Sequence, residues 1–415
     1  MSAFFVEGGH RLEGEIRVHG AKNSVLPILA AAILVPGVSV IQNCPDLSDV
    51  AVSLEILRHL GCRAERSGDT ITVDAGALIR SDVPDDLMRE MRSSVIFLGA
   101  VLGRTGEATM SYPGGCELGP RPIDLHLAAL RSLGAGIEEE TGRLRCSGAL
   151  TGCDITLALP SVGATENAML AAVTASGTTT ITNAAREPEI VDLQRFLCTM
   201  GADIRGAGSS VITVRGGAPL HGGTYAVMGD RIVACTYLAA AAAAGGEITV
   251  KGCDYRHLST VTAVLAEGGC VLRSGPDRID LKCSAPLRAV RPIRTAPYPG
   301  FPTDAQALLM AAFARSTGAT VFVENIFESR YRHVDELIRM GADIKVEGRV
   351  AVVCGVSALH GAAVRSHDLR GGAALVVAAL GAEGKSEITD LHHIDRGYQD
   401  LDKALSSLGA TIQRT

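Results

Sequence analysis

The stretch LQRFLCTMGADI, residues 193–204, contains the pattern that decides the fold. Its first half is an amphipathic helix, which a glycine ends, and a strand with alternating apolar residues follows. The pattern recurs five more times, as LEILRHLGCRAE (54–65), LAALRSLGAGIE (127–138), VTAVLAEGGCVL (261–272), VDELIRMGADIK (334–345) and LDKALSSLGATI (401–412). The chain therefore repeats a unit of about 70 residues, marked by the glycines at 61, 134, 201, 269, 341 and 409.

A second element recurs between these copies, an alanine-rich helix followed by glycine and a strand. Clear examples are AMLAAVTASGTTTI (168–181), TYLAAAAAAGGEITV (236–250) and LLMAAFARSTGATVF (308–322). These helices are apolar on nearly every face, so we expect them to be buried. A thin solenoid offers no enclosed centre for such helices. The pattern therefore favours two globular α/β domains of three repeats each, with strands outside and helices inside.

The composition excludes several classes of function. The chain has 415 residues, of which 47% are hydrophobic, and its net charge of −6 argues against a nucleic-acid or membrane-surface role. Residues 24–41 lack charge, but Pro27 and Pro36 interrupt them, so a buried helix and a strand fit better than a membrane span. The eleven cysteines form no CxxC pair and no metal-ligand pattern, which indicates reduced core thiols in the cytosol.

Two loops contain residues suited to anion chemistry. GAKNS (20–24) places Lys22 where a helix begins, and free N–H groups there favour phosphate, although a solvated surface lysine is the ordinary alternative. PGGCELGPRPIDLH (113–126) places Cys116 in a glycine-rich loop near Arg121, which would favour the thiolate. A structural cysteine in a glycine turn is the alternative there.

The remaining candidate motifs lie before helices or carry clustered arginines. SVGATEN (161–167) is a small-residue loop before a helix, and TAPYPGFPTD (295–304) leads to Asp304, which either caps a helix or acts in chemistry. Arginines gather in ENIFESRYRH (324–333), in DLR (368–370) and in HIDRGY (393–398). Surface salt bridges are the usual explanation for such arginines.

As a set, these motifs resemble the UDP-N-acetylglucosamine 1-carboxyvinyltransferase family of enolpyruvyl transferases. The resemblance runs from about Phe5 to the last residues and includes AAREPEIVDL (184–193) and RTAPYPGFPTD (294–304). It implies two inverse α/β barrel domains built from six βαβαββ repeats. It also implies that residues 22–229 form the domain with the Cys116 loop, and that residues 230–415 form the other, completed by the strand segment 1–21.

The resemblance further implies a reaction and its residues. The family transfers the enolpyruvyl group of phosphoenolpyruvate (PEP) to the 3-hydroxyl of UDP-N-acetylglucosamine, with Cys116 as proton donor and Asp304 as base, without metal or cofactor. The residues implied to bind PEP are Lys22, Asn23, Arg121, Arg330, Arg370 and Arg396. Those implied to bind UDP-N-acetylglucosamine are Arg92, Arg121, Pro122, Ile123, Asp124, Leu125, Ser161, Val162, Gly163, Asp304 and Ile326.

Two departures and two alternatives accompany this interpretation. Some members of the family have a lysine where this chain has Leu159, so the resemblance does not specify the diphosphate contacts there. DLRGGAAL replaces the commoner DLRAGAAL, a small change that should not affect Arg370. The sibling enzyme that acts on shikimate 3-phosphate resembles GDKS at the first motif and lacks the cysteine loop. A non-catalytic paralogue that binds sugar nucleotide is the other alternative. Beyond these small molecules the sequence indicates no partner, and it leaves the oligomeric state open, with a monomer plausible.

Overall fold

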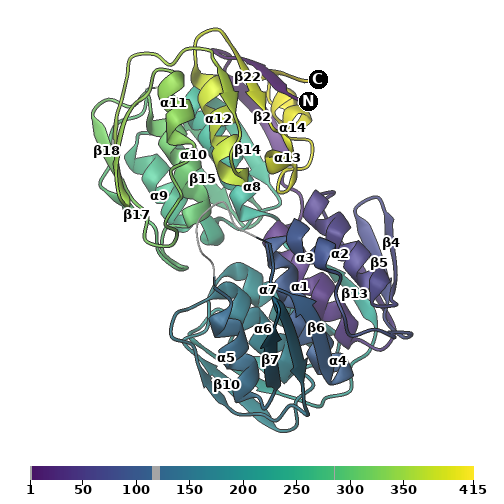
Figure 1. The fold of residues 1–415 in the computed structure, drawn as a ribbon. Coiled ribbons are helices and arrows are strands. Elements are labelled where there is room, and N and C mark those ends of the chain that lie inside the picture. The colour runs from purple at the N-terminus through teal and green to yellow at the C-terminus, as the bar shows by residue number, and fades with distance from the viewer. Residues whose placement is uncertain (1, 115–121, 285) are drawn as a thin grey trace. The chain divides into compact units, whose positions relative to one another are not determined.

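The computed structural model describes residues 2–114, 122–284 and 286–415, so Cys116 and Arg121 lie outside the described residues. The chain forms two compact units, which are considered separately. We call them the 20–228 unit, which contains residues 20–114 and 122–228, and the 229–415 unit, which also contains residues 2–19. The N-terminal segment thus belongs to the same unit as the C-terminal half (Figure 1).

The 20–228 unit alternates helices with short strands. Its helices are α1 (Lys22–Ala31), α2 (Ser48–His59), α3 (Asp85–Glu90), α4 (Phe97–Thr105), α5 (Asp124–Ser132), α6 (Val162–Ala172) and α7 (Pro188–Thr199), with 3-10 turns η1 (Ala32–Leu34) and η2 (Arg92–Ile96). Its strands are β3 (Val38–Gln42), β4 (Arg63–Ser67), β5 (Thr70–Asp74), β6 (Glu107–Ser111), β7 (Gly136–Glu140), β8 (Arg143–Ser147), β9 (Asp154–Thr156), β10 (Thr178–Thr182), β11 (Asp203–Arg205), β12 (Val211–Arg215) and β13 (Gly223–Ala226).

The 229–415 unit follows the same scheme. Its helices are α8 (Arg231–Ala244), α9 (Ser259–Glu267), α10 (Thr303–Phe313), α11 (Val334–Arg339), α12 (Leu369–Gly381), α13 (His392–Asp395) and α14 (Leu401–Ser407), with the 3-10 turn η3 (Tyr255–Leu258). Its strands are β1 (Phe4–Glu7), β2 (Leu12–Arg17), β14 (Gly246–Lys251), β15 (Val271–Gly275), β16 (Arg278–Cys283), β17 (Ile293–Arg294), β18 (Ala319–Val323), β19 (Asp343–Glu347), β20 (Val350–Cys354), β21 (Ala363–Arg365), β22 (Lys385–Thr389) and β23 (Thr411–Arg414).

The described strands form one small sheet per repeat. In five sheets a parallel pair is extended by two antiparallel strands, as in β9-β10-β12-β11, and the sixth sheet is β6-β8-β7. Strands distant in sequence complete two of the sheets in the 229–415 unit, because β2 pairs with β14 and β1 lies between β22 and β23. The repeat predicted from sequence is confirmed, and with it the inverse α/β fold class.

The marker glycines end their helices as predicted. All six adopt a positive φ between 93° and 108°, which side chains other than glycine rarely adopt. At each site the same two backbone bonds close the helix; for example, the N–H of Gly201 donates to Cys198 O and that of Ala202 to Leu197 O, 3.1 and 2.9 Å. A β-branched or bulky residue at these positions would therefore disrupt the passage from helix to strand.

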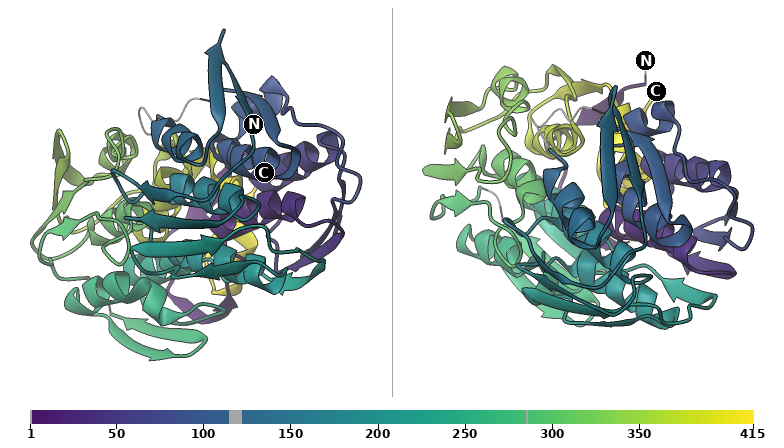
Figure 2. Two further views of the ribbon diagram at one scale, coloured as in Figure 1. Left: turned by 90° about the horizontal axis from the view of Figure 1, so that it is seen from below. Right: turned by 60° about the horizontal axis from the view of Figure 1, so that its bottom comes forward.

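The alanine-rich helices form the centre of each unit. In the 229–415 unit α8, α10 and α12 pack against one another, and nearly every residue along them is buried. In the 20–228 unit, helices α1, α4 and α6 are also largely buried, and α4 packs against both α1 and α6. The sheets lie around these helices in each unit (Figure 2). Among the described residues, no helix is both long and apolar enough to cross a bilayer.

Candidate active site

The candidate residues of the 229–415 unit lie where its inner helices begin. Arg231 opens α8, Asp304 is in the first turn of α10, and Arg370 is in the first turn of α12. The first turn of a helix has free N–H groups and a positive partial charge, which favour anions. Two of these ends are capped internally, since Asp230 Oδ1 accepts from Ile232 N–H and Asp368 Oδ1 accepts from Arg370 N–H, at 2.8 and 3.1 Å.

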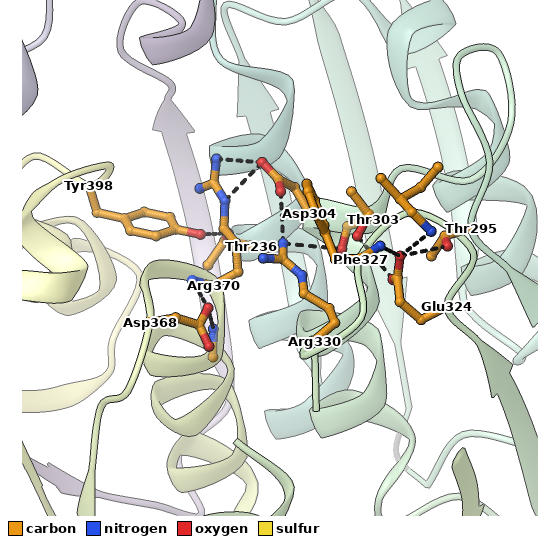
Figure 3. A network of polar contacts seen from close by, with 12 residues as sticks. Thr236, Thr295, Thr303, Asp304, Glu324, Phe327, Arg330, Asp368, Arg370 and Tyr398 are labelled. Carbon is orange, nitrogen blue, oxygen red and sulfur yellow. Dashed lines mark hydrogen bonds and ion pairs between the residues drawn. The ribbon is translucent and has the colours of Figure 1, made fainter. Parts of the chain in front are cut away.

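Asp304 lies between two buried arginines (Figure 3). Arg330 Nη2 donates to Asp304 Oδ1 at 2.7 Å, and Arg370 donates to Oδ2 through Nε and Nη2 at 3.2 and 3.1 Å. The arginine side chains are each 3% exposed, whereas that of Asp304 is 26% exposed. The carboxylate is therefore the accessible member of the group, and both cations reach it from the interior.

The pKa of Asp304 is held well below its usual value. Burial favours the neutral acid, but the charges of Arg370 and Arg330 outweigh burial, and Arg231 adds to them. The sequence left open whether Asp304 caps its helix, and the structure contradicts capping. The N-cap of α10 is Pro302, and Asp304 is the second helical residue, with both carboxylate oxygens bonded to arginine.

Both arginines retain hydrogen-bonding capacity. Within the described residues, Arg330 Nε and Arg370 Nη1 are buried and have no hydrogen-bond partner. Arg370 also lies 5.4 Å from the ring of Tyr398, whose hydroxyl is 2.8 Å from Thr236 Oγ1. A buried, unpartnered guanidinium N–H is costly, so an anion that supplied oxygens here would be stabilised. Surface salt bridges, the ordinary explanation of these arginines, do not apply.

The loop after β18 carries another predicted residue, Ile326, which is 38% exposed. Its backbone is held by Glu324, which is 1% exposed and accepts from Ile326 N–H at 2.8 Å and Phe327 N–H at 3.0 Å. Arg396 ends the short helix α13 and is half-buried. The structure thus brings Asp304, Arg330 and Arg370 into direct contact, while Ile326 and Arg396 lie on separate segments of the same unit.

In the 20–228 unit, Lys22 opens α1 and is not a solvated surface residue. It is 8% exposed, and its Nζ lies 2.6 Å from Asp49 Oδ2, itself buried in α2. The neighbouring Asn23 is exposed. Arg92 begins the turn η2, which packs against both α1 and α6, and its Nη1 donates to Pro113 O at 3.5 Å. Lys22 and Asn23 therefore also lie where an inner helix begins, and Arg92 lies at the start of the turn that leads into α4.

The segments 122–125 and 161–163 meet through a histidine. Ser161 is the N-cap of α6, and a Cβ added to Gly163 would lie 2.7 Å from His126 Cε1. Asn167 orients that ring, since its Nδ2 donates to His126 Nδ1 at 2.8 Å while its Oδ1 accepts from Gly99 N–H at 2.6 Å. The glycine of the SVGAT motif is thus required by close approach to His126.

The other predicted residues at this end differ in exposure. Pro122 and Asp124 are exposed, Ile123 is buried, and Leu125 and Val162 are half-buried. Leu159, at the position of the lysine found in some relatives, is 66% exposed. The roles predicted for Cys116 and Arg121 stay predictions, because both lie outside the described residues.

Most other cysteines are buried, as expected for core thiols. Of the ten that the structure describes, seven are buried and Cys198 is exposed. Burial raises the pKa of Cys44 and of Cys235 to about 12, so these thiols are poor nucleophiles at neutral pH. In the part of the chain that is described, His, Cys, Asp and Glu side chains form no group of three or more suited to a metal ion.

Sequence reasoning missed several residues of these sites. They are Asp49, His126, Asn167, Arg231, Glu324 and Tyr398. His126, Asn167, Glu324 and Tyr398 stand within the motifs already singled out, so the signal was available as a buried polar residue inside a motif. Asp49 and Arg231 lie in ordinary amphipathic or capped helix starts, and sequence offers no such signal for them.

Comparison with known proteins identifies the family. A family model described as EPSP synthase (3-phosphoshikimate 1-carboxyvinyltransferase) matches residues 6–405. The chain is 53% identical over 415 residues to UDP-N-acetylglucosamine 1-carboxyvinyltransferase 2 of Caldanaerobacter subterraneus subsp. tengcongensis, covering 100% of both chains. It is 52% identical to UDP-N-acetylglucosamine 1-carboxyvinyltransferase 1 of Symbiobacterium thermophilum, covering 99% of this chain and 95% of that one.

Solved structures agree. The enolpyruvyl transferase NikO from Streptomyces tendae superposes with a TM-score of 0.89 at 29% identity, covering 100% of this chain and 99% of that one. EPSP synthase from Acinetobacter baumannii shares the fold, with a TM-score of 0.76 at 20% identity over 100% of both chains. The chain therefore belongs to the EPSP synthase family and, within it, to the UDP-N-acetylglucosamine 1-carboxyvinyltransferases.

Proposed function

We propose that this protein transfers the enolpyruvyl group of PEP to the 3-hydroxyl of UDP-N-acetylglucosamine and releases phosphate, the first committed step of peptidoglycan synthesis. With this role, the protein would act in the cytoplasm, in cell-wall growth and division. Its proposed domains are residues 22–229 and residues 230–415, the second completed by residues 1–21. Family membership supports the reaction. The observation that best supports the proposed site is that Asp304 lies between Arg330 and Arg370. Each arginine has a buried N–H group without a partner in the described residues, which is suited to binding an anion.

The reaction consists of addition and elimination. The sugar hydroxyl loses its proton and its oxygen bonds to C2 of PEP, while C3 gains a proton. The tetrahedral adduct then expels phosphate, and C3 loses a proton to restore the alkene. A hydroxyl is a poor nucleophile and an alkene carbon a poor base, so each step needs a positioned group. We assign the hydroxyl proton to Asp304 and the proton delivered to C3 to Cys116.

In the ligand-free geometry Asp304 is a weak base, and PEP binding would make it a stronger one. With two arginines on its carboxylate, its depressed pKa makes proton abstraction unfavourable. The carboxylate and phosphate of PEP would compete for Arg330 and Arg370, which pair well with planar or tetrahedral anions. Loss of those contacts raises the pKa of Asp304. The base is therefore activated by the arrival of the anionic substrate.

The other proposed contacts follow the same electrostatic logic. Lys22, Asn23, Arg121 and Arg396 complete the PEP site, and Lys22 forms an ion pair with Asp49. The proposed contacts of the sugar nucleotide are Arg92, the segments 121–125 and 161–163, Asp304 and Ile326. Ser161 and Gly163 are at the start of α6, where Ser161 Oγ accepts from Ala164 N–H, and the first turn of a helix favours an anionic group.

Phosphate release from PEP tests this function directly. Purified protein is given PEP with UDP-N-acetylglucosamine, with shikimate 3-phosphate, or with no acceptor. We expect phosphate release from PEP with UDP-N-acetylglucosamine, and none with shikimate 3-phosphate or without an acceptor. Release only with shikimate 3-phosphate would assign the protein to the sibling reaction. No release with either acceptor, together with calorimetric binding of UDP-N-acetylglucosamine, would indicate a non-catalytic sugar-nucleotide binder.

A further inference from the structure

We infer that Glu324 is a positioning residue that fixes the base and the sugar-nucleotide loop in one geometry. The inference rests on the proposed function, because it concerns Asp304 and Ile326 in their proposed roles. Glu324 follows β18 directly, is 1% exposed and contacts neither Asp304 nor the two arginines through any bond in the described residues. It acts instead on the segments that carry them.

Four donors converge on the carboxylate of Glu324 (Figure 3). Oε1 accepts from Thr295 Oγ1 at 3.0 Å and from Ile326 N–H and Phe327 N–H at 2.8 and 3.0 Å. Oε2 accepts from Thr303 Oγ1 at 3.0 Å. One side chain thus joins the end of β17, the loop after β18 and the start of α10.

This arrangement departs from the other repeats. The residue directly after the equivalent strand has a positive φ in β3, β10, β14 and β22, where it is Asn43, Asn183, Gly252 and Asp390. Glu324 does not, and the turn is organised by its side chain instead of by a left-handed residue. Tyr112, after β6, also departs from the rule among the described residues, and it leads into the segment of Cys116. The repeat pattern is therefore broken after β6 and after β18, and both of these segments carry proposed site residues.

The bonds of Glu324 reach the proposed base in one step. Thr303 is the residue before Asp304, and its carbonyl oxygen lies 3.4 Å from Arg330 Nη2, the same nitrogen that donates to Asp304. On the loop side, Phe327 places its ring 5.5 Å from the Arg330 guanidinium. Glu324 therefore sets both the direction of Asp304 and the position of one of its two cations.

Replacing one carboxylate oxygen by an amide would disturb this geometry specifically. In Glu324→Gln an NH2 group must face at least one of the four donors, so a bond is lost and two donors oppose each other. A displacement of about 1 Å at a reacting group costs about 100-fold in rate. We expect kcat to fall 10- to 100-fold and KM for UDP-N-acetylglucosamine to rise several-fold, with KM for PEP changing less.

The experiment compares Glu324→Gln with a control of the same chemistry, Glu267→Gln, whose side chain is 32% exposed. Glu267 also accepts a backbone N–H, from Arg291 at 2.9 Å, and lies on α9 away from the proposed site. Kinetic constants, the pH profile of kcat/KM, which reports the free enzyme, and melting are measured for both. For Glu324→Gln alone, the acid limb of the profile should move to higher pH, because looser pairing of Asp304 with arginine raises its pKa.

Thr303 provides a second pair of variants should Glu324→Gln not fold. Thr303→Ser keeps the hydroxyl and should remain near wild type, whereas Thr303→Val should lose about 10-fold in kcat. Equal activity of the two Thr303 variants, or wild-type constants in folded Glu324→Gln, would overturn the inference. So would equal losses in Glu324→Gln and Glu267→Gln that follow melting alone. Absence of phosphate release by the wild type would instead overturn the proposed function.

Discussion

Asp304→Asn separates the proposed base from a merely structural ion pair. The amide keeps the shape of the side chain but removes the charge that Arg330 and Arg370 share. Removing one partner of a buried pair costs about 3–5 kcal/mol, because the remaining charge is buried uncompensated. The side chain of Asp304 is 26% exposed, so water screens part of this cost. We therefore expect a loss of about 1–2 kcal/mol, the lower end reflecting that screening.

The assay measures melting, PEP binding and phosphate release on the same variant. For a domain of this size the stability loss corresponds to a fall in Tm of roughly 2–8 °C. Turnover should fall by about 100- to 10,000-fold, the contribution of a positioned base. Affinity for PEP should be kept or increased, because the arginines no longer have a competing carboxylate, and PEP or inorganic phosphate should restore more Tm in the variant than in wild type.

Acid denaturation provides an independent check that folding lowers the pKa of Asp304. Because the folded pKa of Asp304 lies below its unfolded value of about 3.9, the pair stabilises wild type fully above that pH and less as the pH falls below it. Asp304→Asn should lack this part of the acid dependence. Normal turnover in the folded variant would refute the assignment as base. Strongly weakened PEP binding would refute the competition between Asp304 and PEP for the arginines.

Four further outcomes are expected. Arg396→Ala should weaken PEP binding more than sugar-nucleotide binding in titrations, and equal losses would contradict its role. Gly163→Ala should raise KM for UDP-N-acetylglucosamine about 10-fold or more, since its Cβ would meet the His126 ring at 2.7 Å. Burial lowers the pKa of His333 to about 4, so the free energy of unfolding should decrease as the pH falls from 6.5 to 4. In urea titrations, His333→Gln should remove about 2–3 kcal/mol of this decrease. Fosfomycin, a small anionic epoxide, should alkylate Cys116 alone in peptide mass spectrometry, and label on a core thiol would contradict this.

The fold could be predicted because its signals are local. A glycine such as Gly201 ends a helix by its own backbone freedom, and the strands β11 and β12 that follow show their buried face by alternation. Helix α8 indicated its central position by having no polar face after its first turn. These features need no knowledge of distant partners. The repeats then multiplied each local signal, so the fold class followed from comparison of the chain with itself.

The electrostatic part of the site could not be predicted, because it depends on contacts across the sequence. Nothing around Lys22 shows that it is buried against Asp49, since both lie in helix starts that are equally suited to solvent. The TAPYPGFPTD stretch suggested a cap at Asp304, but the backbone enters α10 two residues earlier, which turns that carboxylate toward two arginines. Local sequence specifies that a helix starts, but the exact residue that starts it decides what a charged side chain meets.

The placement of these residues has one physical basis. An inner helix that is apolar all round can carry charge only at its ends, and the N-terminal end also provides free N–H groups and a positive partial charge. Arg370 and Arg231 lie there beside aspartates that cap the same helices, so cations are held where the dipole alone would repel them. Such an end is unstable without negative charge. The capping aspartates and Asp304 supply it in the free protein, and we propose that a substrate with more negative charge than one carboxylate takes the place of Asp304. The proposed anion site and the proposed base would thus be two consequences of burying helix starts that carry arginine.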